Sequence, residues 1–144
     1  MTRAVLVNGV PASGKSTLAR ALGRRLHVPV LELDAVKEVL FEEVGHQGGD
    51  REWGRALGRA SLGSIWALLA GFPADALVIV EAWFRRAPHD HITEGLAHAG
   101  VDRWVEVWCH AHPDILVERY AARKRHAGHP AAADYVAELR ALSL

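Results

Sequence analysis

Residues 4–17 read AVLVNGVPASGKST, and the interpretation of the whole chain starts from this stretch. Its first five residues form a short, branched apolar run that stops at Gly9, which is typical of a strand buried on both faces. In the residues that follow, Leu18, Leu22 and Leu26 recur at a spacing of four, which places them on one face of a helix. The stretch therefore predicts a strand, a glycine-containing turn and a helix.

The turn satisfies the pattern G-x-x-x-x-G-K-[ST], which composition alone would produce in about one chain in a thousand of this make-up. Gly9 and Gly14 permit backbone angles that aim consecutive N–H groups at an anion, and the helix N-terminus adds its positive end. Lys15 supplies a full charge for β and γ phosphates, Ser16 a hydroxyl for Mg²⁺, and Thr17 a hydroxyl for the α phosphate. We expect a nucleotide polyphosphate to be bound by Gly9, Pro11, Ala12, Ser13, Gly14, Lys15, Ser16 and Thr17.

Strand-like and helix-like segments alternate along the rest of the chain. Strands are predicted at 28–33, 77–80 and 104–108, and helices at 35–44, 50–71, 88–99, 113–126 and 131–142. This alternation predicts an α/β fold, in which helices cover both faces of a doubly wound parallel sheet of four to five strands in three layers. At 144 residues, the chain is expected to form a single domain, residues 1–144.

Charge and cysteine content exclude several classes of protein. The 17 Lys and Arg residues balance 17 Asp and Glu residues, which argues against a general binder of nucleic acid or of membrane surfaces. No apolar run is long enough for a transmembrane helix, and the N-terminus lacks the features of a signal peptide. The single cysteine, Cys109, fits a reducing compartment, so a cytoplasmic protein is expected; the oligomeric state stays open.

Acidic residues follow two of the predicted strands, Glu32 and Asp34 after the second and Glu81 after the third. Ligands of parallel sheets lie outside the carboxyl ends of the strands, where the glycine-containing turn also lies. We expect Asp34 to be the base that orients an acceptor hydroxyl, and Ser16, Glu32 and Glu81 to be the residues that hold Mg²⁺, the acids through its waters. The alternative for Asp34 is a simple N-cap of the following helix.

Other nucleotide-binding classes fit the sequence less well. A GTPase would carry an N-K-x-D motif, and an AAA-type ATPase is usually larger, with a strand that ends in Asp-Glu. This chain has no N-K-x-D, and its third strand ends in Glu81 alone. Small size with a bare phosphate loop favours a small-molecule kinase.

The motif GVPASGKST (9–17) followed by LELDAVKEVL (31–40) resembles the small P-loop kinases related to polynucleotide kinase, chloramphenicol phosphotransferase, gluconate kinase and the zeta toxins. The resemblance covers most of residues 4–130 and implies a P-loop kinase fold with a lid helix. It also implies that Asp34, which stands where these kinases carry their base, activates the acceptor hydroxyl. The segment VIVEAWFRR (78–86) is similar to their third strand and acceptor-contacting turn, so Trp83 and Arg85 are expected to contact the acceptor.

The segment HPDILVERYAARKRHAGHP (112–130) resembles the lid of these kinases, whose arginines close on the ATP phosphates. Arg119, Arg123 and Arg125 match that pattern. Arg119 and Arg123 also lie four residues apart, on one helix face, where they would neutralise charge that develops during transfer. The alternative is a solvated face with Glu118 as a local partner.

Three further groups of residues have less specific interpretations. Arg51, Arg55 and Arg59 are spaced by four and are interpreted as a charged outer helix face. Packing of Trp83 against the helix at 50–71 is as reasonable as a contact with the acceptor. The nine histidines do not have the paired spacing of a structural zinc site.

Together these features predict an enzyme that uses ATP and Mg²⁺ to phosphorylate a hydroxyl acceptor. The acceptor is a small molecule or a polynucleotide 5′ end, which is the one role left for nucleic acid. The alternative is a regulatory module that binds ATP and hydrolyses it slowly without transfer.

Overall fold

The computed structural model describes residues 2–45, 50–86, 89–123 and 126–143. Four parallel strands form one sheet in the order β2-β3-β1-β4. They are β1 (Thr2–Gly9), β2 (Val30–Glu32), β3 (Leu77–Glu81) and β4 (Val101–Cys109). Each lies where the sequence predicts a strand, although β2 is shorter than the apolar segment 28–33.

Six helices complete the described part of the chain. They are α1 (Lys15–Leu26), α2 (Leu33–Val44), α3 (Arg51–Ala70), α4 (Asp90–His98), α5 (Pro113–Ala122) and α6 (Ala132–Leu142). The largest differences from the predicted helix boundaries are three: α2 begins two residues early, α4 begins two residues late, and α5 ends at Ala122 rather than near His126. The helix α5 ends early because the backbone of Arg123 is extended, with φ −82° and ψ 133°. The prediction that Arg119 and Arg123 share one helix face is therefore wrong, since only Arg119 belongs to the helix. No helix among these described segments is long and apolar enough to cross a membrane.

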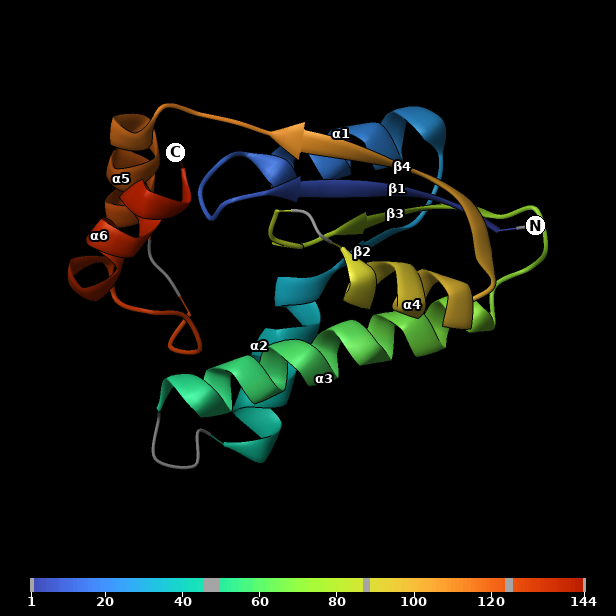
Figure 1. Ribbon diagram of the computed structural model, residues 1–144, viewed down its shortest axis with the longest axis horizontal. Coiled ribbons are helices and arrows are strands. Elements are labelled where there is room, and N and C mark those ends of the chain that lie inside the picture. Colours follow the sequence, from blue (N-terminus) through green and yellow to red (C-terminus); the bar gives the residue numbers. More distant parts are fainter. Residues whose placement is uncertain (1, 46–49, 87–88, 124–125, 144) are drawn as a thin grey trace.

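Alternating side chains of the central strands build two cores, one on each face of the sheet. Val7 and Ile79 pack against Ala19 of α1, whereas the neighbouring residues Leu6 and Val80 belong to the cluster that includes residues of α3 and α4. Figure 1 shows α1 on one side of the sheet and α3 and α4 on the other. The predicted three-layer, doubly wound parallel arrangement is thereby confirmed.

Strand register brings three loops to one edge of the sheet. Val7 of β1 and Glu32 of β2 both pair with Glu81 of β3, and Gly9 pairs with Cys109 of β4. The carboxyl ends of all four strands therefore lie together, and Figure 1 shows α5 and α6 stacked beside each other at this end of the molecule. Any ligand held by the turn after β1 lies beside the ends of β3 and β4, and the end of β2 follows next to β3.

Candidate functional site

The turn between β1 and α1 has a backbone shape that its glycines make possible. Gly9 has φ +156°, and a Cβ there would lie 2.5 Å from Ser13 Oγ and 2.7 Å from the Cys109 carbonyl oxygen. Gly14 is the N-cap of α1 and has φ +94°, a left-handed backbone conformation that favours glycine. A Cβ at this position would meet no atom within 4 Å, so the backbone conformation and not a lack of space calls for glycine. Ala12 also has a positive φ, +68°. The loop is held in a strained, open conformation at the N-terminus of α1, the arrangement that binds anions.

Inside this loop, Ser13 has a buried hydroxyl without a hydrogen-bond partner in the described part of the chain. An orphaned buried hydroxyl is costly unless a ligand oxygen completes it. The Arg119 guanidinium donates to the Ala12 carbonyl oxygen at 3.4 Å, which ties α5 to the loop from outside. These observations fit a loop that receives phosphate oxygens.

Lys15, Ser16 and Glu81 form one polar group at the bottom of the site. Lys15 is 8 % exposed and its Nζ lies 3.7 Å from Glu81 Oε1, while Ser16 Oγ donates to Glu81 Oε2 at 3.2 Å. Glu81 is only 1 % exposed; burial raises the pKa of its carboxyl, and the Lys15 ammonium opposes that shift. A hydroxyl and a carboxylate at one point are hard oxygen donors, the donor type that Mg²⁺ requires, so these residues fit the ion.

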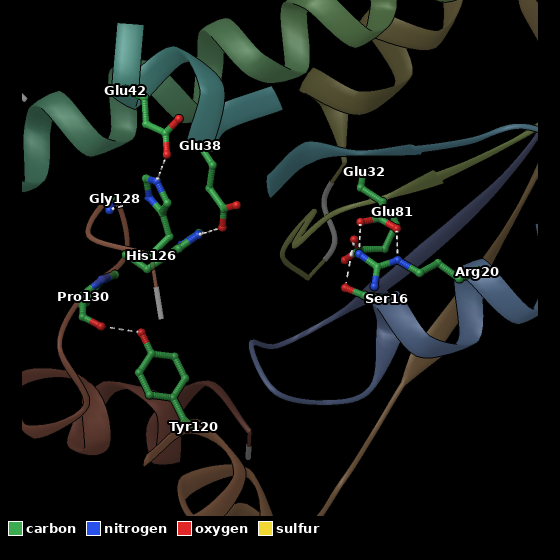
Figure 2. A network of polar contacts seen from close by, with 11 residues as sticks. Ser16, Arg20, Glu32, Glu38, Glu42, Glu81, Tyr120, His126, Gly128 and Pro130 are labelled. Carbon is green, nitrogen blue, oxygen red and sulfur yellow. Dashed lines mark hydrogen bonds and ion pairs between the residues drawn. The ribbon is translucent and has the colours of Figure 1, made fainter. Parts of the chain in front are cut away.

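The other acid at this end of the sheet, Glu32, is engaged elsewhere. Its two carboxylate oxygens accept from Arg20 of α1, at 2.5 and 2.7 Å (Figure 2). The same residue is the N-cap of α2, although its side chain does not cap the helix. Asp34 is therefore inside the first turn of α2 and is not the N-cap that one interpretation of the sequence offered.

A cavity of about 1050 Å³ opens between the phosphate loop, α2, α3 and α6. Most of the predicted catalytic, metal-binding and acceptor residues line it, and four residues of the phosphate loop are among the predicted residues found there: Pro11, Ala12, Lys15, Ser16, Asp34, Glu81, Trp83, Arg85 and Arg123. The other predicted residues do not line it: Gly9, Ser13, Gly14, Thr17, Glu32 and Arg119. Arg125 lies outside the described residues.

Residues 127–131 line the cavity, and the neighbouring His126 contacts α2 (Figure 2). His126 Nε2 lies 2.9 Å from Glu42 Oε1, and His129 Nε2 lies 2.9 Å from Glu38 Oε1. The Tyr120 hydroxyl of α5 donates to the Pro130 carbonyl oxygen at 2.7 Å. The segment predicted as a lid therefore packs onto the helix that carries Asp34.

Sequence reasoning missed several cations of the cavity wall. Arg51, Arg55 and Arg59 are exposed, as expected for an outer face, but this face of α3 lines the cavity. Gly54 and Gly58 of the repeat R-x-x-G-R-x-x-G-R line it beside them, with open space where a Cβ on either glycine would lie. That repeat is the signal that would have indicated a cavity wall.

Lys37 also lines the cavity, one helical turn after Asp34. Burial lowers the pKa of its ammonium, and the charges of Asp34 and Glu38 oppose the shift. Its side chain has no ion-pair partner in the segments that the structure describes. A desolvated cation that faces a cavity favours an anionic group there.

The fold and this site define a P-loop protein of the kinase type. A family model described as an AAA domain, AAA_33, matches residues 5–141, and the chain belongs to that family. The description of this family contains the term AAA, the class of ATPase that the sequence disfavoured because the third strand ends in Glu81 alone. Three similar solved structures are described as kinases. No curated protein matches the sequence.

Among solved structures, a protein from Chloroflexus aurantiacus that is provisionally described as a kinase is 28 % identical, with a TM-score of 0.80; the match covers 99 % of this chain and 80 % of that one. A gluconokinase from Sinorhizobium meliloti is 21 % identical, with a TM-score of 0.61 and coverage of 98 % and 74 %. A shikimate kinase from Bacteroides thetaiotaomicron is 23 % identical, with a TM-score of 0.58 and coverage of 96 % and 76 %. The last two likenesses concern the fold alone.

Proposed function

We propose that the protein is an ATP-dependent phosphotransferase that moves the γ-phosphate of ATP to an acceptor hydroxyl. The observation that carries this proposal is the shared cavity: Lys15 and Ser16 of the phosphate loop and Asp34 of α2 line one space. A nucleotide-binding loop without a facing base would suit hydrolysis or simple binding, whereas a carboxylate across the cavity suits proton removal from an acceptor.

In this proposal, the phosphates are bound by loop amides and by cations at the cavity edge. Lys15 bridges the β and γ phosphates, and the Thr17 hydroxyl assists at the α phosphate. The contact of Arg119 with the Ala12 carbonyl, and the position of Arg123 on the cavity wall, support their roles as charges that stabilise the transferring phosphoryl group. Arg125 is proposed for the same task.

Magnesium would be held by Ser16 and, through water, by Glu81, whose oxygens lie together at the end of β3. When bound, the ion neutralises charge on the phosphate oxygens. Glu32 is the weaker candidate, because both its oxygens already accept from Arg20.

Asp34 is proposed as the general base. The acceptor oxygen attacks the γ-phosphorus, and the bond between this phosphorus and the bridging β–γ oxygen breaks. The hydroxyl proton passes to Asp34, and the products are ADP and a phosphorylated acceptor. The half-buried ammonium of Lys37 lies one helical turn from Asp34 and lines the same cavity.

The cations that line the cavity support an acceptor that carries an anionic group beside its hydroxyl. Lys37 and the arginine row of α3 line the cavity, and so do Trp83 and Arg85. A guanidinium binds carboxylate or phosphate oxygens in bidentate fashion, and an indole provides an apolar face. Small hydroxylated acids, phosphorylated alcohols and polynucleotide 5′ ends fit this description.

The test measures ADP release from MgATP with and without acceptors: neutral polyols, hydroxy acids, phosphorylated alcohols, and a 5′-hydroxyl oligonucleotide. We expect one anionic acceptor to stimulate ADP release and to become phosphorylated. Asp34→Asn should abolish transfer and keep MgATP affinity, while Asp102→Asn, on exposed β4, should match the wild type in both. Unstimulated, slow ADP release with every acceptor would instead favour the regulatory ATP-binding module.

A further inference from the structure

Asn8 is a fully buried amide whose hydrogen-bonding capacity is completely used. Its Oδ1 accepts from the Gly9 N–H at 2.8 Å and from the Phe84 N–H at 3.0 Å. Its Nδ2 donates to the Arg85 carbonyl at 2.9 Å and to Glu106 Oε1 at 2.6 Å. Two N–H donors face the oxygen and two acceptors face the nitrogen, so the partners themselves determine which way the amide points.

These four bonds join three segments that are far apart in the sequence. Gly9 opens the phosphate loop, Phe84 and Arg85 form the turn after β3, and Glu106 belongs to β4. Arg85 has φ +67°, a left-handed conformation that costs a non-glycine residue about 1 kcal/mol or more. Asn8 holds that strained residue on both sides, through the preceding amide and through its own carbonyl.

We propose that Asn8 is a positioning residue that makes the phosphate loop and the acceptor turn one mechanical unit, so that a nucleotide on the loop orders the turn that faces the acceptor. This inference rests on the proposed function, because the turn contacts the acceptor only if transfer occurs. In-line transfer depends on such placement: a displacement of about 1 Å can cost about a hundredfold in rate. Asn8 itself touches neither ATP nor acceptor.

Glu106 acts as the outer anchor of this unit. Its second oxygen, Oε2, lies 3.4 Å from His89 Nε2, so the carboxylate is held from the side away from Asn8. A carboxamide at position 106 would still offer an oxygen to Asn8 Nδ2, whereas no short side chain at position 8 can reach both Phe84 and Arg85. This asymmetry provides a matched control.

The test is hydrogen–deuterium exchange of the whole chain with and without saturating MgATP, read at residues 9–17 and 83–86. In the wild type, MgATP should slow exchange in both segments, by about threefold or more in 83–86. In Asn8→Ala, MgATP should still slow exchange in 9–17 but no longer in 83–86. Glu106→Gln should behave like the wild type. The nucleotide-dependent difference is the readout, because a merely structural role would change basal exchange alone.

Four outcomes would decide the matter. A wild type whose 9–17 segment ignores MgATP would refute the proposed function and overturn the positioning role with it, because no nucleotide on the loop could then order the turn. Slowing in 9–17 without slowing in 83–86, or equal slowing at 83–86 in Asn8→Ala, would overturn the positioning role alone. If Asn8→Ala does not fold, Asn8→Ser takes its place, since its hydroxyl reaches the adjacent Gly9 amide but not the turn. Failure of both variants to fold would make Asn8 a structural residue and overturn the proposal.

Discussion

The buried charge pair beneath the phosphate loop allows a quantitative prediction for Lys15→Met. This change removes the ammonium 3.7 Å from Glu81 and leaves a carboxylate that is 1 % exposed with Ser16 as its one hydrogen-bond donor in the described chain. Removal of one partner of a buried pair costs about 3–5 kcal/mol. Because the Ser16 bond persists, we expect the low end, about 3 kcal/mol in the free energy of unfolding at pH 8.

The pH dependence has a definite sign. Burial already raises the pKa of the Glu81 carboxyl above its ordinary value of 4.5, and loss of Lys15 removes the charge that opposed this shift. The native variant therefore binds a proton that the unfolded chain has released, so its stability falls as pH rises from 4.5 through the raised pKa. The deficit relative to wild type should be small at pH 5 and largest at pH 8.

Urea denaturation followed by circular dichroism at pH 5 and pH 8 measures this deficit. The control is Lys15→Met/Glu81→Gln, which removes both charges and should regain stability to within about 1 kcal/mol of wild type. Neither variant should bind MgATP tightly, so stability and binding separate in the double variant. A Lys15→Met protein with the same deficit at both pH values, or a double variant no more stable than the single one, would refute the reasoning.

Two pairs of glycine substitutions give the remaining predictions. Gly9→Ala should destabilise the protein by about 2–4 kcal/mol and weaken MgATP binding measured by calorimetry, because the new Cβ brings both backbone strain and a clash. Gly14→Ala adds backbone strain alone and should cost about 1 kcal/mol. Equal losses of stability in the two variants would contradict the geometry. Gly95→Ala should lower the free energy of unfolding by about 1–3 kcal/mol in thermal or urea denaturation, since its Cβ would collide with the Trp66 indole. Gly63→Ala, at an exposed position of α3, should raise it by about 0.5–1 kcal/mol. A stabilised Gly95→Ala would show that the indole moves aside at no cost.

The periodicity of the sequence was sufficient to locate the four strands and six helices that the structure describes. Apolar runs such as 77–80 and the four-residue spacing of Leu18 and Leu22 are local signals, because side-chain direction repeats every second residue in a strand and about every fourth in a helix. The phosphate loop was equally local: two glycines and the lysine between a strand and a helix define it. The alternation of elements then implied a parallel sheet.

Partners across elements were decided only by the tertiary structure. Glu32 and Glu81 look alike in sequence, because both are acids at strand ends. In the structure, Glu32 forms an ion pair with Arg20 of α1, whereas Glu81 forms one with Lys15. The face of α3 that carries Arg55 is polar by pattern, and only the packing of α3 against α2 turns it into a cavity wall. Asn8 gave no signal at all, because its four bonds reach segments up to 98 residues away, and sequence spacing encodes no such distance.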